Sequence, residues 1–180
     1  MIVEETFLKG CLIIKPKVFT DDRGYFFESF NLKKFKDETG VSVNFIQDNQ
    51  SKSSAGVLRG LHFQKAPYSQ AKLVRVIQGK VLDVVVDLRK NSPTFGKHFK
   101  IVLDAQEHTQ LFIPRDFAHG FLVLSDTVIF SYKCDNFYHK DSEQGIIYND
   151  PDLNIDWGLP AEKLLLSDKD LRLPRLKDIF

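Results

Sequence analysis

The sequence predicts a mainly β protein, built as an antiparallel barrel or sandwich. Most of the chain consists of short segments rich in β-branched and aromatic residues, separated by turn residues such as glycine, asparagine and aspartate. With 180 residues, the chain is long enough to bury a core without disulfides. No repeat, low-complexity tract or linker divides it, so we expect a single domain over residues 1–180.

The strands are predicted from the alternation of apolar and polar residues and from the turn residues that bound each run. Between "LVRVIQ" and "VLDVVVDL", the pair Gly79-Lys80 predicts a hairpin turn. The strands are expected at residues 11–19, 25–30, 45–50, 57–64, 72–78, 81–88, 97–103, 110–113, 120–124 and 128–137.

A short helix and a C-terminal tail complete the expected elements. Asn31 can cap the helix "LKKFKDET", and Gly40 is its natural stop. After Tyr148 the chain has several prolines and few strand-like runs. Because Leu153 and Trp157 would be costly to leave in water, we expect this tail to pack across the domain.

Composition excludes several classes of partner. The 25 Lys and Arg residues nearly cancel the 24 Asp and Glu residues, and both signs are spread along the chain, which argues against nucleic-acid binding. Cys11 and Cys134 have no metal-ligand spacing and are expected to be buried thiols. No signal peptide or apolar run of membrane length is present, so we expect a cytoplasmic protein with no membrane partner.

Two histidines lie in strand-like apolar segments, His62 in "RGLHFQ" and His119 in "PRDFAHGF". Strict alternation would place Arg59 and His62 on opposite faces of their strand, unless the strand bends at Gly60. Cationic and phenolic side chains that converge with these histidines would need an anionic ligand. The neighbouring predicted strands supply Lys72, Arg75, Tyr132 and Lys133.

A metal-binding cupin is one alternative, because its first motif carries two histidines one residue apart and then a glutamate. Here that position contains His62, Phe63 and Gln64, and the next glutamate is Glu107. Two imidazoles make a poor site for a metal that requires three or four ligands, so no metal is expected. A histidine can instead transfer protons when a carboxylate orients it, and the tail offers both Asp168 and Asp170.

Several segments together resemble one family, the dTDP-4-dehydrorhamnose 3,5-epimerases. The match runs in order from about residue 7 to residue 174. The resemblance implies a cupin-like jelly roll, a homodimer, no cofactor, and a dTDP-sugar substrate with a C4 ketone that is inverted at C3 and C5. The segments are "FTDDRGYFFESFN", "FIQDNQSKSSAGVLRGLHFQ", "KLVRVIQGKVLDVVVDLRKNSPTFG", "LFIPRDFAHGFLVLSD", "YKCDNFYHK", "NDPDLNIDW" and "LSDKD".

The resemblance also implies roles for individual residues. His62 matches the general base, Asp170 its dyad partner, Lys72 the group that stabilises the enolate oxygen, and Tyr132 the acid at C5. The residues implied in substrate binding are Arg23, Glu28, Gln47, Asp48, Asn49, Arg59, His119, Tyr138, Glu143 and Lys169. Among these, Arg59 and His119 are expected at the diphosphate and Tyr138 stacked on thymine.

Two features of the sequence affect this assignment of roles. Asp116 stands where the family pattern has glycine, which could alter the turn before His119. A register slip in the tail would exchange Asp170 for Asp168, and we favour Asp170.

Other functions remain open at this point. They are an epimerase that acts at one carbon only, a related sugar-nucleotide enzyme that works on another base or hexose, a non-catalytic barrel that binds sugar nucleotides, and a metal-dependent cupin enzyme. Tyr132 argues against an epimerase limited to C3. The 16 phenylalanines are many for one small barrel and give a modest physical indication of a dimer interface.

Overall fold

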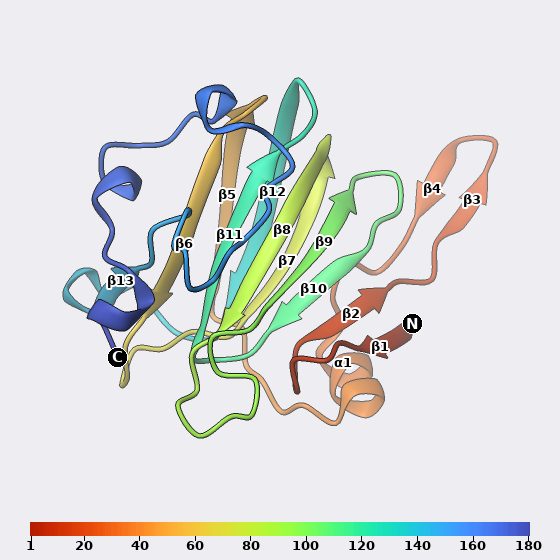
Figure 1. Ribbon diagram of the computed structural model, residues 1–180. Coiled ribbons are helices and arrows are strands. Elements are labelled where there is room, and N and C mark those ends of the chain that lie inside the picture. Colours follow the sequence, from red (N-terminus) through yellow and green to blue (C-terminus); the bar gives the residue numbers. More distant parts are fainter.

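The computed structural model describes residues 1–180 as two antiparallel sheets packed face to face, plus a separate hairpin (Figure 1). The six-stranded sheet contains, in spatial order, β1 (Ile2–Glu5), β2 (Leu12–Lys15), β10 (Gln110–Ile113), β7 (Lys72–Gln78), β12 (Thr127–Cys134) and β5 (Gln47–Ser54). The five-stranded sheet contains β13 (Glu143–Gly145), β6 (Leu58–Gln64), β11 (Phe117–Val123), β8 (Lys80–Asp87) and β9 (His98–Asp104). The hairpin consists of β3 (Phe19–Asp21) and β4 (Gly24–Phe26).

The predicted mainly β, cupin-like architecture is confirmed, although the two sheets share no ladder that would close them into one barrel. The strands β7 and β10 begin and end at the predicted residues. The prediction omitted β1 and β13, whose sequences "IVEE" and "EQG" are short and at least half polar. Such segments become strands because a neighbouring strand edge offers them hydrogen bonds, which local sequence does not reveal.

The predicted hairpin at Gly79-Lys80 is wrong. β7 pairs with β10 and β12, whereas β8 pairs with β11 and β9 in the other sheet. Gly79 therefore lies at a corner where the chain crosses between the sheets. Its φ is +83°, and a Cβ added there would lie 2.1 Å from the carbonyl oxygen of Thr127. A tight corner and a hairpin both require glycine, so the local sequence could not separate them.

The predicted helix is confirmed as α1 (Leu32–Thr39). The Asn31 side chain accepts a hydrogen bond of 3.1 Å from the backbone N–H of Lys34. Gly40 adopts a left-handed conformation with φ of +70°, and its N–H donates to the carbonyl of Lys36. Phe35 anchors the helix, because its ring is buried against the outer face of the six-stranded sheet.

The core has three layers: one between the sheets, one outside the five-stranded sheet, and a smaller one between α1 and the six-stranded sheet. The inner layer includes Val74, Val85 and Phe130. In the layer outside the five-stranded sheet, Trp157 and Leu176 of the tail pack against that sheet, which confirms the predicted path of the tail (Figure 1, blue). The tail contains the short 3₁₀ turns Ala161–Lys163, Asp170–Arg172 and Leu176–Asp178, and a further turn, Lys140–Ser142, precedes β13.

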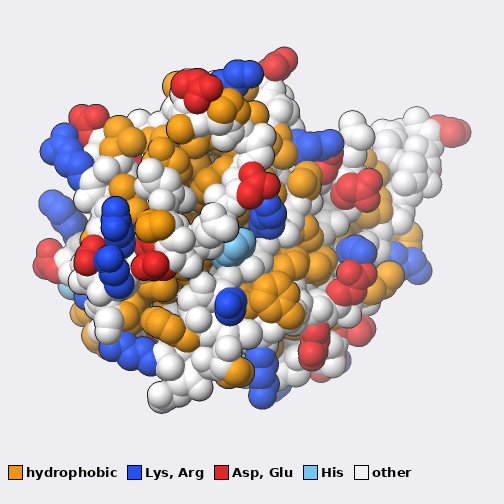
Figure 2. All heavy atoms as spheres, viewed as in Figure 1, with side chains coloured by type: hydrophobic (Ala, Val, Ile, Leu, Met, Phe, Trp, Pro, Cys, Tyr) orange, Lys and Arg blue, Asp and Glu red, His pale blue; other side chains and the backbone are white.

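Figure 2 shows positive and negative side chains interspersed over the face in view, as the balanced composition predicted. None of the helices combines the length and the hydrophobicity that a membrane span requires.

We predict that Gly79→Ala lowers the free energy of unfolding by about 3 kcal/mol, because the new Cβ meets backbone as well as an unfavourable φ. Gly158→Ala is the matched control, since Gly158 has φ of +76° with open space around it and should lose only about 1 kcal/mol. Urea denaturation of both variants at one pH measures the difference. Equal losses would show that the crossing does not depend on close packing at Gly79.

Candidate active site

A cavity opens between the two sheets, and it has two lobes that share His62, Lys72 and Tyr132. The first, named here the Arg59 lobe, has a volume of about 550 Å³ and the second, the Tyr138 lobe, about 360 Å³. The Arg59 lobe is also lined by Ser51, Arg59, His119, Phe121, Phe130 and residues 165–167, 169 and 170 of the tail. The Tyr138 lobe is also lined by Gln47, Asn49, Gln64, Gln70, Tyr138 and Glu143.

A bulge in β6 brings Arg59 and His62 to the same cavity. His62 pairs with His119 of β11, whereas Arg59 pairs with Phe121, so three steps along β6 oppose two along β11. Gly60 allows this irregularity, with φ of +126° and so little room that an added Cβ would lie 2.5 Å from the Cα of Gly120. The bend expected at Gly60 is therefore present.

His62 contacts a carboxylate from the tail. Its Nε2 lies 2.6 Å from Oδ1 of Asp170, whose side chain is only 5% exposed. Burial acts to raise the pKa of Asp170, but the hydrogen bond and charge of His62 outweigh burial, so this pKa is lowered. Asp168 is exposed and pairs with Arg172 instead. In this structure the tail therefore presents Asp170, and not Asp168, to the imidazole.

The tail reaches this position along the edge of β6. Leu165 forms a parallel bridge with Val57, in which its N–H donates to Gly56 and its carbonyl accepts from Leu58. Farther along, Ser167 accepts a hydrogen bond of 3.1 Å from the N–H of Asp170. These contacts fix the register on which the His62 contact depends.

Lys72 and Tyr132 lie on adjacent inward positions of β7 and β12. Lys72 has no carboxylate within salt-bridge distance, and its Nζ lies 5.9 Å from the centre of the Tyr132 ring. Burial lowers the pKa of Lys72, although the nearby Cys134, Asp83 and Glu143 act to raise it. Burial likewise raises the pKa of the Tyr132 hydroxyl, so this phenol stays protonated at neutral pH. The two side chains provide a cation and an acid in one cavity.

Arg59 and His119 line the same lobe but differ in burial and partners. Arg59 is exposed to the cavity and donates through Nε to Ser53 at 3.1 Å, with no carboxylate partner. His119 is buried, and its Nε2 lies 2.9 Å from Oδ2 of Asp83. Asp116 takes a left-handed φ of +64°, as the glycine of the family pattern could, so the substitution leaves His119 facing the cavity.

Sequence reasoning missed Asp83, which is fully buried beside His119. One of its carboxylate oxygens, Oδ1, has no hydrogen-bond partner in the structure. A signal was present, because an aspartate interrupts the apolar run "VLDVVVDL" at a position that alternation points inward.

The Tyr138 lobe contains four of the predicted binding residues, Gln47, Asn49, Tyr138 and Glu143, and a fifth, Lys169, reaches it from the Arg59 lobe. The Tyr138 hydroxyl donates to Glu143 at 3.0 Å, and Lys169 pairs with the same carboxylate at 2.6 Å. Burial acts to raise the pKa of Glu143, but these two neighbours outweigh it and the pKa is lowered. Gln47 accepts from the N–H of Tyr138 and donates to Asn49 at 3.1 Å. The structure thus brings this group together at one mouth of the cavity.

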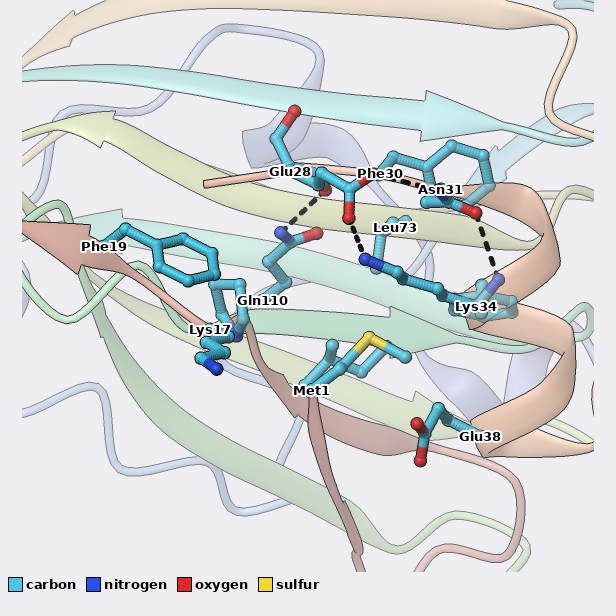
Figure 3. A pocket seen from close by; sticks show the side chains of 14 residues that line it. Met1, Lys17, Phe19, Glu28, Phe30, Asn31, Lys34, Glu38, Leu73 and Gln110 are labelled. Atoms are coloured by element: carbon cyan, nitrogen blue, oxygen red, sulfur yellow. Dashed lines mark hydrogen bonds and ion pairs between the residues drawn. The ribbon is translucent and has the colours of Figure 1, made fainter. Parts of the chain in front are cut away.

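Three predicted binding residues lie elsewhere in the chain's own fold. Arg23 is 89% exposed at the tip of the β3–β4 hairpin, where it pairs with Asp21. Glu28 faces a separate pocket beside α1 and pairs with Lys34 and Asn31 (Figure 3). Asp48 points outward from β5.

The expected convergence of all the strand cations is wrong for two of them. Lys133 pairs with Asp48 at 2.9 Å on the outer face of the six-stranded sheet. Arg75 lies over the ring of Phe27, 5.8 Å from its centre. Arg75 is three residues from Lys72 on a regular strand, so alternation turns these two side chains to opposite faces.

No cluster of three or more His, Cys, Asp and Glu side chains has the geometry to hold a metal ion. At the position of the second cupin histidine, the Gln64 amide bonds to neighbouring loops instead. The arrangement suits proton transfer next to a bound anion, with an imidazole–carboxylate pair, an unpaired ammonium and a phenol around one space.

Comparison with known proteins identifies related sequences. Residues 5–178 match the family model described as dTDP-4-dehydrorhamnose 3,5-epimerase. A curated relative of that name from Shigella flexneri is 53% identical over 99% of this chain and 97% of its own length. The Escherichia coli K12 relative of the same name is 51% identical over 100% of this chain and 97% of its own length.

Solved structures give the same result. The dTDP-4-dehydrorhamnose 3,5-epimerase of Elizabethkingia anophelis superposes with a TM-score of 0.95 at 56% identity, covering 99% of this chain and 97% of that one. The Legionella pneumophila dTDP-6-deoxy-D-glucose-3,5-epimerase, solved in complex with dTDP-4-keto-L-rhamnose, has a TM-score of 0.95 at 45% identity, covering 99% and 94%. The resemblance found in the sequence motifs is confirmed: this chain belongs to the dTDP-4-dehydrorhamnose 3,5-epimerase family.

Proposed function

We propose that this protein inverts C3 and C5 of dTDP-4-dehydro-6-deoxy-D-glucose, without a cofactor, to form dTDP-4-dehydro-L-rhamnose for dTDP-L-rhamnose synthesis. The observation that carries the proposal is that His62 with Asp170, Lys72 and Tyr132 line one cavity, inside a chain that belongs to the family of that name. The proposal treats residues 1–180 as one catalytic domain.

The chemistry starts from the C4 ketone. Protons on C3 and C5 are acidic because the negative charge left by their removal is delocalised onto the C4 oxygen as an enolate. His62 removes such a proton as general base, and Asp170 orients the imidazole and stabilises its charged form. A proton returned to the opposite face of the carbon then inverts its configuration.

Lys72 and Tyr132 complete the two half-reactions. The Lys72 ammonium stabilises the enolate oxygen, and such a donor is typically worth about 3 to 4 kcal/mol in the transition state. An ammonium with no carboxylate partner is well suited to this role, since a developing negative charge meets no competing anion. Tyr132, kept protonated by burial, returns a proton at C5.

The substrate would be held by both lobes of the cavity. Arg59 and His119 bind the diphosphate in the Arg59 lobe, where a guanidinium free of carboxylates matches phosphate geometry. Tyr138 stacks on thymine. Gln47, Asn49, Glu143 and Lys169 hydrogen-bond the substrate near Tyr138.

The proposed roles of Arg23 and Glu28 in substrate binding require a homodimer. The β3–β4 hairpin projects from the body (Figure 1), and it leaves Phe19, Tyr25 and Phe26 at least half exposed. Such aromatic rings favour a covering partner. We infer that the hairpin of one protomer brings Arg23, and the segment after it Glu28, to the nucleoside end of the other protomer's cavity.

Because the Asp48 side chain pairs with Lys133 on the outer face, its proposed substrate contact is limited to its backbone.

Cys11 and Cys134 are both free and buried, which accords with the proposed cytoplasmic location.

We predict that the protein exchanges solvent deuterium into both C3 and C5 of the 4-keto sugar, observed by proton NMR without added metal or nicotinamide. Asp170→Asn should slow this turnover about 100-fold or more, since the imidazole loses its anionic partner. Asp168→Asn is the matched control and should behave as wild type, because Asp168 is exposed. Exchange at one carbon alone, or equal losses in both variants, would contradict the assignment.

Lys72→Met should separate function from stability. Turnover should fall about 10²- to 10³-fold with loss of the oxyanion donor, while the free energy of unfolding at pH 7 should rise by about 1 kcal/mol. Burial lowers the pKa of Lys72, so the fold disfavours its charged form, and the stability gap between variant and wild type should narrow as the pH rises toward about 10.4.

Lys52→Met is the control for the lysine prediction, because Lys52 is an exposed strand lysine of β5. It should change stability by no more than about 0.5 kcal/mol and leave turnover unchanged. Chemical denaturation at pH 7 and at pH 9.5 measures the free energy of unfolding of the wild type and of both variants. A destabilised Lys72→Met variant would contradict the expected cost of burying the ammonium.

A mixed dimer tests the shared site. Arg23→Ala should raise the KM, and His62→Ala should abolish turnover. A dimer of one protomer of each kind should recover the wild-type KM with about half the wild-type turnover, because one site then has both residues. Retention of the raised KM in that dimer would show that Arg23 serves the cavity of its own chain. A monomer in light scattering at micromolar concentration would exclude the shared site.

A further inference from the structure

The Gln64 side chain is buried between two loops at the edge of the Tyr138 lobe, and the mechanism above does not use it. Its amide makes three hydrogen bonds to backbone. Nε2 donates to the carbonyl of Tyr68 at 2.7 Å and to that of Phe137 at 3.2 Å, and Oε1 accepts from the N–H of His139 at 2.7 Å. Both N–H groups and one acceptor site are therefore occupied.

The partners dictate a primary amide at this position. Two of them are carbonyl oxygens and one is an N–H, so the amide can lie only one way round. A carboxylate would place oxygen against two carbonyl oxygens, and an aliphatic side chain would leave all three buried groups unpaired. The chemistry that makes position 64 unsuitable as the second metal ligand of a cupin thus makes it a tether between loops.

The tether holds the backbone on both sides of Tyr138, because Phe137 and His139 are its immediate neighbours in the chain. The ring of His139 stacks on Tyr68, with centres 3.8 Å apart and planes 3° apart. Where β6 pairs with β13, Gln64 lies opposite Glu143, and Glu143 accepts the hydrogen bond of the Tyr138 hydroxyl. Gln64 thus holds the backbone on both sides of Tyr138, and its strand partner Glu143 holds the Tyr138 hydroxyl.

We propose that Gln64 is a positioning residue for nucleotide binding, which fixes the backbone on either side of Tyr138 so that its ring is already placed for the base. This inference rests on the proposed function, in which Tyr138 stacks on thymine. The three hydrogen bonds of the Gln64 amide go to the backbone of Tyr68, Phe137 and His139, so in this proposal Gln64 acts through Tyr138. Its loss should therefore raise the dissociation constant of the nucleotide and leave chemistry at saturation nearly unchanged.

The test uses Gln64→Glu in the full-length protein, with calorimetric binding of dTDP and steady-state turnover of the 4-keto sugar. The dissociation constant for dTDP and the KM should both rise about tenfold, whereas kcat should stay within about threefold of wild type. Lowering the pH from 8 to 5 should bring the dissociation constant of the variant closer to that of wild type, because a protonated carboxyl can again donate one hydrogen bond.

Gln144→Glu is the matched control, since it places the same charge on the neighbouring strand β13 and removes none of the three hydrogen bonds. It should bind dTDP within about twofold of wild type. A double-mutant cycle with Tyr138→Ala then asks whether Gln64 acts through that ring. In the Tyr138→Ala background, Gln64→Glu should have little further effect on dTDP binding.

Each outcome separates the two proposals. If the wild-type protein neither binds dTDP nor turns over the sugar, the proposed function fails. If wild type does both and Gln64→Glu binds dTDP normally, or lowers kcat as much as it raises KM, or adds its full effect to Tyr138→Ala, the role of Gln64 is overturned. Should Gln64→Glu fail to fold, Gln64→Asn supplies the same comparison with an amide too short to reach both loops.

Discussion

The contact of Gly60 with Gly120 is the constraint on which the cavity depends. These glycines let β6 and β11 approach so closely that neither position has room for a side chain. The resulting bulge turns Arg59 and His62 toward one cavity, while Leu58, Leu61 and Phe63 pack into the outer core. A regular β6 would bury one of the two functional side chains in apolar surroundings or expose it on the wrong face.

The tail is the second requirement, because it supplies the carboxylate that His62 contacts. Its apolar residues, including Trp157 and Leu176, pack on the outside of the five-stranded sheet. A buried Asp150 secures the same region by accepting a hydrogen bond of 2.6 Å from the N–H of Leu176. The packing of the outer core therefore decides the position of Asp170 in the inner cavity, which connects stability of the tail directly to the chemistry.

Charge inside the cavity costs stability and permits function. Lys72 and Arg59 lack carboxylate partners, and Asp83 keeps one oxygen without a hydrogen bond. Groups of this kind are unfavourable in an empty cavity, and an anionic ligand would compensate them. By contrast, the fully hydrogen-bonded polar side chains, notably Gln64, lie around the rim of the cavity and hold loops in place.

The sequence by itself determined the mainly β class, the family, most strand positions and both ends of α1, because these follow from alternation, motifs and local hydrogen bonds such as those of Asn31 and Gly40. Only the tertiary structure decided that Gly79 is a corner between sheets. It also decided that Asp170, 108 residues from His62, is the nearer carboxylate, and that Asp83 lies beside His119. Strand register, the bulge at Gly60 and the path of the tail depend on contacts between distant segments, and local sequence does not encode them.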